Sequence, residues 1–405
     1  MGFVVGKPQI LRARTSAYGV TPAVYRWFAL VTSGVNNYVG ANSAGEFSDG
    51  NPALFLLALD KAVGTPWTSA GTTPNYYKIL LPFDATLGVT KPTGAVNFRA
   101  ALGSNNELAQ VYLGDLHGKV WKLDFSLYAS TSWNINSLNP FKKGSAAPFT
   151  PLPMYIAKDA SGNVQPITMA PSIIAGPSVN EIPTSYLAFG TGQYIQVADK
   201  TSTSQNSFYA IHDNGSTTSD TTSSSRESVI SGRLRLQTAT VNAAAGTVTA
   251  APFTWGRPLT DADTTQRSGW FFDYPTTGER QISNSTVVGD NVIFGSLIPA
   301  ATGAGTSCAA VGGSGYQYTA NIDTGTGSTK VSNVGLLGEV FTMEGGSTYG
   351  PTRNTGRRTK TVQTPVIQQG QLGVASSGAA ATTTFAAGRL SWRQINNYQD
   401  LKNAP

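Results

Sequence analysis

Residues 111–124 read VYLGDLHGKVWKLD, and this stretch decides the fold. Two short apolar runs flank a turn that contains Gly118, and the second run ends at Asp124. Short apolar runs on either side of a glycine-containing turn are typical of two antiparallel strands joined as a hairpin. Trp121 lies in the second run, where a large aromatic side chain packs well on a half-buried sheet. The stretch therefore predicts an antiparallel strand pair.

The same order of strand, glycine, strand and aspartate recurs along the chain. Strand pairs of this kind lie near residues 28–60, 111–124, 186–213 and 292–323, with loops of different length inside them. A unit repeated at irregular spacing indicates one small sheet that is copied along the chain and carries variable insertions. The aspartate after each second strand is expected to accept hydrogen bonds from backbone N–H groups two residues on, which closes the turn. These aspartates are Asp60, Asp124, Asp213 and Asp323.

The composition favours an all-β fold with long polar loops. Charged residues make up 12% of the chain, and there are 44 glycines. β-Branched and aromatic residues dominate the apolar runs, as they do in strands. Together with the repeat, this predicts a β-propeller, in which each added sheet extends the core. No apolar run is long enough to cross a bilayer, and the single cysteine, Cys308, excludes a disulfide within this chain.

The net charge of +6 raises the question of a nucleic-acid partner. The densest basic run lies at residues 353–360 and contains no aromatic side chain on which a base would stack. The remaining basic residues are spread along the chain. We therefore expect a solvated loop at 353–360 and no nucleic-acid partner.

Residues 58–67, ALDKAVGTPW, carry a second structural signal. The order of Asp60, a glycine and Trp67 is similar to the tryptophan-docking signature of quinoprotein-type propellers. In those proteins the tryptophan packs between neighbouring blades. We accordingly expect Trp67 to pack between two blades of a quinoprotein-like propeller.

Four passages in a fixed order carry a more specific resemblance. They are residues 111–126, residues 189–194 with 206–215, residues 269–280 leading into 292–299, and residues 388–395. With them the chain resembles the C-terminal β-propeller of the PilC/PilY-type factors, the tip-associated adhesins of bacterial type IV pili. The resemblance implies a propeller of the modified seven-bladed type, of which this chain supplies four or five blades. Residues 1–405 are then the C-terminal propeller region of a longer chain.

The resemblance also implies a function. Members of this family are non-enzymatic factors of pilus assembly and adhesion, which support pilus extension against retraction and surface attachment or twitching motility. The implied partners are minor pilins at the pilus tip and a host or abiotic surface. The implied location is the cell surface at the pilus tip, after export as part of a longer precursor whose signal is not in this sequence. Candidate contact loops are residues 35–52, 128–151, 196–206 and 216–226.

A calcium site is the one cofactor that the family suggests. Its members commonly have an Asp-rich calcium loop just before the hairpin described above, where this chain reads LGSNNELA at residues 102–109. Asn105, Asn106 and Glu107 offer one carboxylate and two amides to an ion that takes about six to eight oxygen ligands. We expect a plain hairpin loop here, with no calcium and no other cofactor.

Catalytic groups are sparse. The two histidines, His117 and His212, lie at a turn and at a strand end, where we expect them to face solvent. Zinc-ligand spacing and a nucleophile elbow are absent from the sequence. The turn residues Gly114, Asp115 and Gly118 are expected to shape the hairpin, and Glu279–Arg280 to form a surface ion pair of little energetic weight. Because every repeat places an aspartate at the same point, Asp115 and Asp124 are interpreted as structural and not as a catalytic pair.

Two alternative functions remain open at this stage. One is a pyrroloquinoline-quinone-type propeller dehydrogenase, which shares the tryptophan signature, although Cys308 alone cannot form the disulfide of adjacent cysteines that many such enzymes carry. The other is a propeller that binds glycans through tryptophan and tyrosine residues on its loops. Binding of the quinone cofactor would favour the first alternative, and a glycan array would identify the second.

Overall fold

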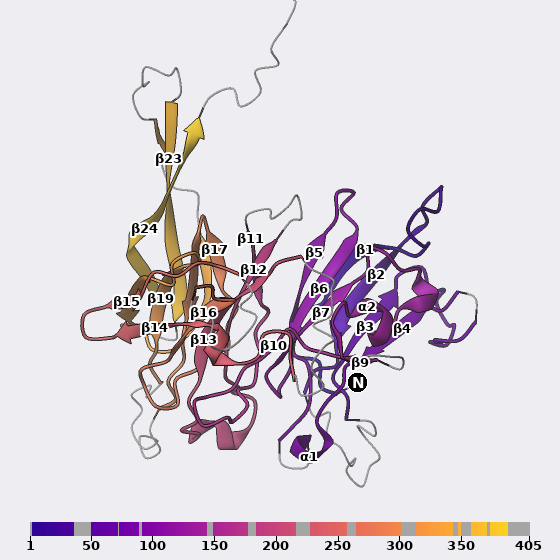
Figure 1. Ribbon diagram of the computed structural model, residues 1–405, viewed down its shortest axis with the longest axis horizontal. Coiled ribbons are helices and arrows are strands. Elements are labelled where there is room, and N and C mark those ends of the chain that lie inside the picture. The colour runs from indigo at the N-terminus through magenta and orange to yellow at the C-terminus, as the bar shows by residue number, and fades with distance from the viewer. Residues whose placement is uncertain are drawn as a thin grey trace, which may run out of the picture.

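The computed structural model describes residues 2–35, 50–71, 73–88, 91–143, 149–176, 184–215, 227–256, 265–300, 313–342, 347–349, 358–370 and 373–387. Nearly all regular structure in these residues is β-strand (Figure 1). The helices are single turns: α1 (Ala85–Gly88), α2 (Ile135–Leu138), η1 (Ser130–Ser132), η2 (Val197–Lys200) and η3 (Arg233–Arg235). No helix in the described part of the chain has the length and apolarity to span a membrane.

The first two sheets are four-stranded and antiparallel. The first sheet has the order β1-β2-β3-β4, with β1 (Gln9–Arg14), β2 (Tyr25–Thr32), β3 (Ala53–Ala58) and β4 (Tyr76–Leu80). The second sheet has the order β10-β7-β6-β5, with β5 (Phe98–Leu102), β6 (Leu108–Gly114), β7 (Lys119–Asp124) and β10 (Tyr155–Ile156). A small ladder of β8 (Lys142–Lys143) and β9 (Thr150–Pro151) lies between β7 and β10 in the chain.

The third and fourth sheets repeat this plan. The third sheet contains β11 (Ser172–Ala175), β12 (Ser185–Gly190), β13 (Ser207–Asp213) and β16 (Gly269–Asp273). The fourth contains β17 (Thr286–Val288), β18 (Asn291–Gly295), β19 (Tyr316–Asn321) and β20 (Gly327–Val331). The hairpin of β14 (Gln237–Asn242) and β15 (Thr247–Ala250) links the two, because β14 pairs with β16 and β15 pairs with β20.

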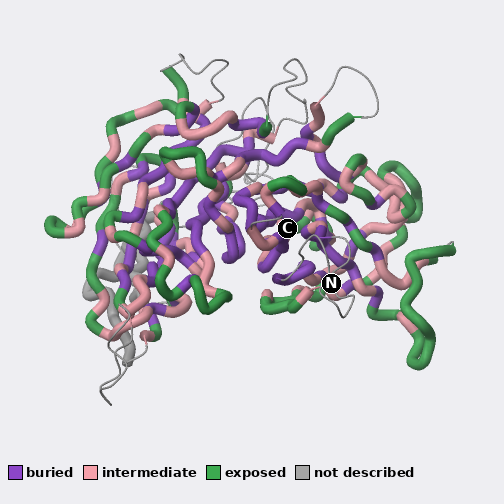
Figure 2. Tube along the Cα trace, turned by 90° about the horizontal axis from the view of Figure 1, so that it is seen from below, coloured by how far each residue is buried: buried purple, intermediate pink, exposed green. Residues whose placement is uncertain are grey.

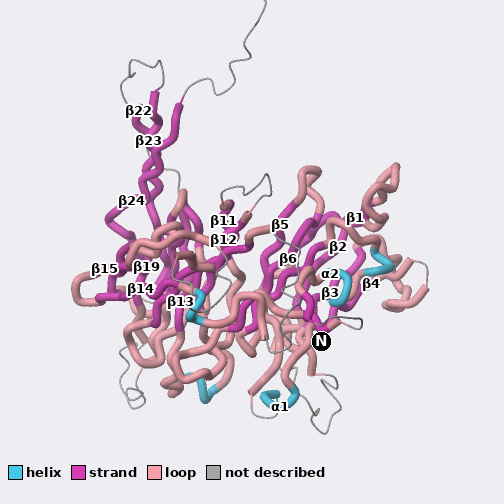
Figure 3. Tube along the Cα trace, viewed as in Figure 1, coloured by secondary structure: helices cyan, strands magenta, loops and turns pink. Residues whose placement is uncertain are grey.

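A fifth sheet follows. It contains β21 (Leu337–Thr342), β22 (Ser347–Tyr349), β23 (Arg358–Gly370) and β24 (Gly373–Ala387). The antiparallel β23–β24 ribbon extends away from the body of the molecule (Figure 3).

The predicted strand pairs are hydrogen-bonded neighbours. β2 pairs with β3, β6 with β7, β12 with β13 and β18 with β19, all antiparallel. Within each pair a strand alternates its side chains between the two faces of its sheet, and both faces are apolar. Such a sheet is stable only when both faces are covered, which explains why the sheets stack on one another.

Consecutive sheets share hydrophobic cores. One core lies between the first and second sheets, another between the second and third, and another between the third and fourth, while Val288, Ile293 and Val340 join the fourth sheet to β21. In Figure 2 the buried segments follow one another along an arc through the molecule. Sheets stacked face to face in chain order are the architecture of a β-propeller, so the predicted fold class is confirmed.

Candidate functional site

The β6–β7 hairpin is organised around the side chain of Asp115, which is fully buried. Its Oδ1 atom accepts hydrogen bonds from the backbone N–H groups of His117 and Lys119, both at 2.9 Å. Its Oδ2 atom accepts a bond from the indole Nε1–H of Trp121 at 3.0 Å. Gly118 has a φ of +76°, which L-residues rarely adopt. Burial raises the pKa of the Asp115 carboxyl. One carboxylate thus closes the turn and also fixes the ring of Trp121.

The two histidines are buried, so the expectation that they face solvent is wrong. His117 is 2% exposed, and its Nε2 atom lies 3.3 Å from the Lys91 carbonyl oxygen. Burial lowers the pKa of His117, which favours its neutral form. His212 is 7% exposed and packs between the rings of Tyr186 and Trp255. Segments distant in sequence cover both side chains, and a single turn pattern carries no signal of this.

Asp213 joins two sheets. Its Oδ1 atom accepts the N–H of Gly215 at 3.0 Å, two residues on. Its Oδ2 atom lies 2.6 Å from both the Lys122 ammonium and the Tyr112 hydroxyl of the second sheet. The side chains of Lys122 and Asp213 are each 3% exposed. Such a buried pair is costly to break, because removal of one partner leaves an uncompensated charge.

The fourth sheet is joined to the third in a related way. The Asp323 carboxyl, after β19, lies close enough to the hydroxyl of Tyr186 in β12 for the two groups to interact electrostatically. Burial, followed by the nearby Asp323 charge, raises the pKa of Tyr186 to about 12. In both places a tyrosine hydroxyl of one sheet lies near the aspartate at the end of the third strand of the next sheet.

Two other aspartates make more local contacts. Asp124 accepts the N–H of Ser126, two residues on, at 2.9 Å. Asp60 does not close a turn in the expected way, because Arg26 takes both its oxygens at 3.0 and 2.7 Å. The Arg26 guanidinium lowers the pKa of Asp60. The Asp60 side chain is 59% exposed, so solvent screens most of this attraction.

Trp67 is not docked between two of the described sheets, which corrects the expectation. It is 50% exposed, packs edge-on against Tyr76 of the first sheet and lies 5.0 Å from the Lys61 ammonium. Trp133, in contrast, lies between two sheets. Its ring packs against Phe28 and Tyr77 of the first sheet and against Phe125, which follows β7. The sequence signal was available, because Trp133 follows Asp124 much as Trp67 follows Asp60.

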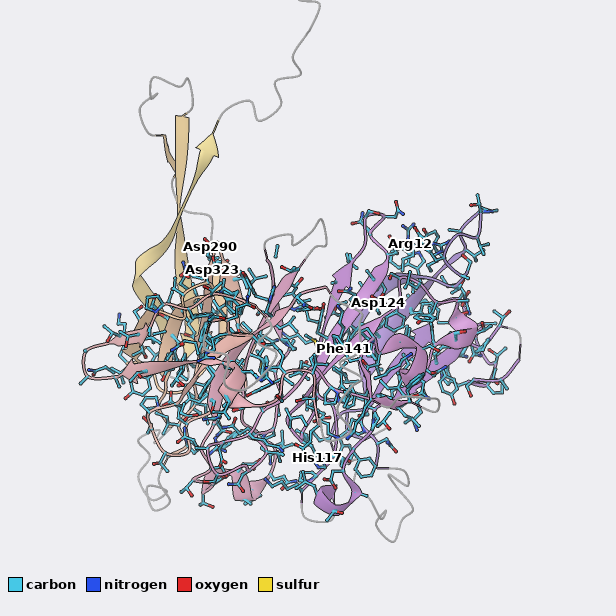
Figure 4. The ribbon with its side chains drawn as sticks, in the orientation of Figure 1. Arg12, His117, Asp124, Phe141, Asp290 and Asp323 are labelled. Carbon is cyan, nitrogen blue, oxygen red and sulfur yellow. The ribbon has the colours of Figure 1, made fainter. Side chains whose placement is uncertain are left out.

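The loop at residues 102–109 is a tight hairpin that does not fit calcium. Asn106 has a φ of +57°, and the Glu107 carboxylate accepts the N–H of Asn105 at 2.9 Å. The Arg12 guanidinium donates to the Asn105 carbonyl oxygen, which places a cation where the metal would need a ligand. Figure 4 shows Arg12 in the upper part of the molecule and His117 in its lower part. Within the described ranges no three His, Cys, Asp or Glu side chains are grouped for a metal ion.

Gly114 sits against the segment between β10 and β11, because a Cβ atom at this position would clash with the side chain of Ile167. Glu279 and Arg280 are 0% and 2% exposed, so the predicted surface ion pair is wrong. Glu279 accepts bonds from the hydroxyls of Ser296 at 2.5 Å and Tyr318 at 2.7 Å, and burial raises the pKa of its carboxyl.

Arg280 shapes a polar cavity. Its guanidinium donates to the carbonyl oxygens of Gly278, Gln193, Asp199 and Ser202 at 2.8 to 2.9 Å, and so holds the 193–202 loop. The cavity has a volume of about 600 Å³. Its wall is rich in amide and hydroxyl groups, contributed by Asn163, Gln193, Gln196, Ser202, Thr203, Ser204, Gln205 and Asn206. The sequence-based contact loop 196–206 contributes seven of the sixteen residues that line the cavity. The cavity is suited to a polar ligand or to a polar segment of a partner protein.

A smaller cavity of about 250 Å³ lies where β1, β5, β17 and β21 meet the segment that leads into β11. There the Lys7 ammonium lies 2.7 Å from the Glu339 carboxylate of β21, which also accepts a bond from the Asn284 amide at 2.9 Å. These contacts connect the N-terminal segment directly to the fifth sheet.

Comparisons with known proteins agree with this architecture. Residues 91–251 match the family described as the PilY1 beta-propeller domain. A type IV pilus biogenesis factor PilY1 homolog of Xylella fastidiosa is 25% identical over 346 residues, which cover 83% of this chain and 20% of that protein. The type IV pilus biogenesis factor PilY1 of Pseudomonas aeruginosa is 27% identical over 341 residues, which cover 75% of this chain and 28% of that protein. The chain therefore spans only about a fifth to a quarter of these relatives.

A solved structure has the same fold. The crystal structure of the Pseudomonas aeruginosa PilY1 C-terminal domain superposes with a TM-score of 0.53 at 20% sequence identity, covering 95% of this chain and 72% of that one.

Proposed function

We propose that this chain, which forms a β-propeller and is similar to PilY1-type proteins, serves as a type IV pilus biogenesis factor. In this role it supports pilus extension against retraction, and through it surface attachment or twitching motility. It acts at the cell surface, at the pilus tip, after export within a longer precursor. The observation that carries the proposal is the family match over 91–251, which contains the β6–β7 hairpin and the Lys122–Asp213 link between sheets.

We propose that this role involves no catalysis. Asp115, His117 and Glu279 are buried groups whose chemistry would suit an acid or base, and each has a hydrogen-bond partner within the described part of the chain. The quinone-dependent alternative has a direct test: the purified protein is mixed with pyrroloquinoline quinone and calcium, and its absorbance is followed. Stoichiometric binding with dehydrogenase activity would overturn the non-enzymatic proposal.

The polar cavity is our candidate for the minor-pilin contact. Its wall is held by the Arg280 hydrogen bonds, so a partner would meet an ordered surface and lose little entropy to loop ordering. The same amide and hydroxyl groups are suited to a saccharide, which makes glycan binding the second candidate function. A glycan array with the purified protein addresses that candidate.

The cellular test is deletion of the gene in its own host. We expect loss of surface pili by electron microscopy, and their return when pilus retraction is disabled as well. Unchanged piliation would refute the role in biogenesis, and pili that stay absent without retraction would refute the role against retraction.

The contact test uses two matched variants. Thr203→Arg places a large side chain at the exposed rim of the polar cavity, whereas Thr247→Arg makes the same change on an exposed position of β15 outside it. Calorimetry with purified minor pilins should show loss of binding for Thr203→Arg alone. Equal binding by both variants would exclude this cavity as the contact.

A further inference from the structure

Lys122 and Asp213 bring an amine and a carboxyl group into contact away from water. Lys122 lies within β7 of the second sheet, and Asp213 is the last residue of β13 in the third sheet. The Lys122 Nζ atom lies 2.6 Å from the Asp213 Oδ2 atom, and each of the two side chains is 3% exposed. Lysine and aspartate are seldom buried so completely. Besides forming an ion pair, two such groups can condense to an amide.

The neighbouring side chains determine where the protons of this cluster lie. The Tyr112 hydroxyl lies 2.8 Å from the Gln110 Oε1 atom and 2.6 Å from the Asp213 Oδ2 atom. A hydroxyl has one proton, so it cannot donate to both oxygens. The Gln110 amide N–H donates to the Asp124 carboxylate at 3.4 Å, which turns the Gln110 Oε1 atom toward Tyr112. Tyr112 therefore donates to Gln110, and the proton between Tyr112 and Asp213 belongs to the carboxyl group.

This arrangement presents both groups in their reactive forms. The proton on the Asp213 carboxyl comes from the Lys122 ammonium, which becomes a neutral amine with a free lone pair. Exclusion of water favours the neutral pair, because water would otherwise solvate the two charges. The Gly215 N–H donates to the Asp213 Oδ1 atom at 3.0 Å and so polarises the carbonyl group that the amine faces.

We propose that Lys122 and Asp213 form an isopeptide bond, an amide between the lysine Nζ and the aspartate Cγ atoms. The Nζ lone pair attacks Cγ, and the bond between Cγ and Oδ2 breaks. Oδ2 leaves as water with two of the three protons of the former ammonium group, and the third proton stays on Nζ as the amide N–H. The reaction needs no oxidant, reductant or cofactor. Its product joins the second and third sheets covalently.

Proximity and burial favour a condensation that is unfavourable between separate molecules in water. Two groups fixed in contact react as if at an effective concentration of about 10⁵–10⁸ M. In water, solvation stabilises the charged amine and carboxylate against condensation. Side chains that are 3% exposed have lost that solvation.

Two other lysine pairs separate the effect of distance from that of burial. The pairs Lys7–Glu339 and Lys158–Glu227 have nitrogen–oxygen distances of 2.7 Å, close to that of Lys122 and Asp213. Their lysine side chains are 71% and 35% exposed, so water solvates the charges. We expect both to remain ion pairs, and they serve as internal controls.

The bond would act as a disulfide does in other proteins. A cross-link between residues 122 and 213 limits the freedom of the unfolded chain and so stabilises the folded one. A disulfide within this chain is excluded, because Cys308 is its single cysteine. Resistance of the two sheets to a pulling force on the pilus is a use that rests on the proposed function, whereas formation of the bond does not.

The first test is the mass of the purified 405-residue chain, shown to be folded by circular dichroism and then measured under denaturing conditions. We expect a mass lower than that of the sequence by one water molecule. In a trypsin digest, residues 120–142 and 201–226 should form one branched peptide, because trypsin does not cut after an acylated lysine. No branched peptide should contain Lys7 or Lys158. A full sequence mass would overturn the proposal, as would a water loss confined to the 201–226 peptide, which indicates cyclisation of one residue.

The second test compares two variants that each remove one lysine amine. Lys122→Met keeps a side chain of similar length and should have its full sequence mass, whereas Lys158→Met should still lack one water molecule. Loss of water from Lys122→Met would overturn the proposal. The wild-type digest decides the question even where Lys122→Met fails to fold. Neither measurement involves pili, so this proposal and the proposed function can fail separately.

Discussion

Replacement of Asp115 by asparagine is the most informative single change in this protein. The carboxylate uses one oxygen for two backbone N–H groups and the other for the indole N–H of Trp121. Asparagine retains one acceptor oxygen and places an NH₂ group at the other position. If the amide oxygen of the asparagine keeps the two backbone hydrogen bonds of the turn, its NH₂ group faces the indole N–H of Trp121. Two hydrogen-bond donors then face each other in a fully buried place, without an acceptor.

The cost follows from these contacts. A buried indole N–H without an acceptor costs about 1–3 kcal/mol. The two turn bonds also lose the assistance of a charged acceptor, at about 1 kcal/mol each, while relief of the buried carboxylate offsets part of this. We therefore expect Asp115→Asn to lower the free energy of unfolding by about 2–4 kcal/mol. Asp124→Asn is the matched control, because an amide oxygen still accepts the N–H of Ser126, and its expected loss is below about 1 kcal/mol.

Urea unfolding followed by circular dichroism measures both losses. A double-mutant cycle with Trp121→Phe isolates the shared bond, because phenylalanine removes the donor that asparagine leaves unsatisfied. The loss in the double variant should be smaller than the sum of the single losses by about 1–3 kcal/mol. Equal losses for Asp115→Asn and Asp124→Asn, or strict additivity with Trp121→Phe, would refute this account of the hairpin.

Three further predictions concern separate parts of the fold. Burial raises the pKa of Glu279 above its ordinary value of 4.5, so the stability that this shift contributes is complete below pH 4.5 and is lost as the pH rises through the folded-state pKa. As the pH rises through this range, the melting temperature of Glu279→Gln should therefore rise relative to that of the wild type. Parallel pH profiles of the two proteins would contradict this. Gly118→Ala should lower the free energy of unfolding in urea by about 1–3 kcal/mol more than Gly162→Ala does. Both glycines have a positive φ, but a Cβ atom at Gly118 would lie 2.7 Å from the Ala157 carbonyl oxygen, whereas one at Gly162 would have no atom within contact distance. Equal losses for the two variants would count against the close approach at Gly118. Calorimetric titration with calcium should give the same result for the wild type and for Glu107→Gln, with no binding at the 102–109 loop. A stoichiometric binding heat that is lost in Glu107→Gln would show that this loop binds calcium.

The local pattern of the chain was enough to predict the strand pairs and the hairpin. Bonds from an aspartate to N–H groups two residues on depend on a few neighbouring dihedral angles, so Asp124 and Asp213 behave as the sequence suggests. The same reasoning failed for Asp60, where Arg26 lies on the adjacent strand and competes for both oxygens. The first three family passages also carried the fold, because they cover parts of the second, third and fourth sheets, whereas residues 388–395 lie outside the described residues.

The candidate site was harder to predict, because its contacts join residues far apart in the chain. The Arg280 guanidinium reaches carbonyl groups of the 193–202 loop, and this wall of the polar cavity has no motif of its own. Burial of His117 under the segment that contains Lys91 is equally invisible to a turn pattern.

The sequence by itself determined the all-β class, the repeated strand pairs and the family resemblance, because strand alternation and turn geometry are written in residues that are close together. Only the tertiary structure decided which side chains join one sheet to the next. It selected Lys122 as the partner of Asp213, and Trp133 in place of Trp67 as the tryptophan between two sheets. Such choices depend on how whole sheets stack, and stacking is set by the burial of both faces of each sheet and not by any single segment.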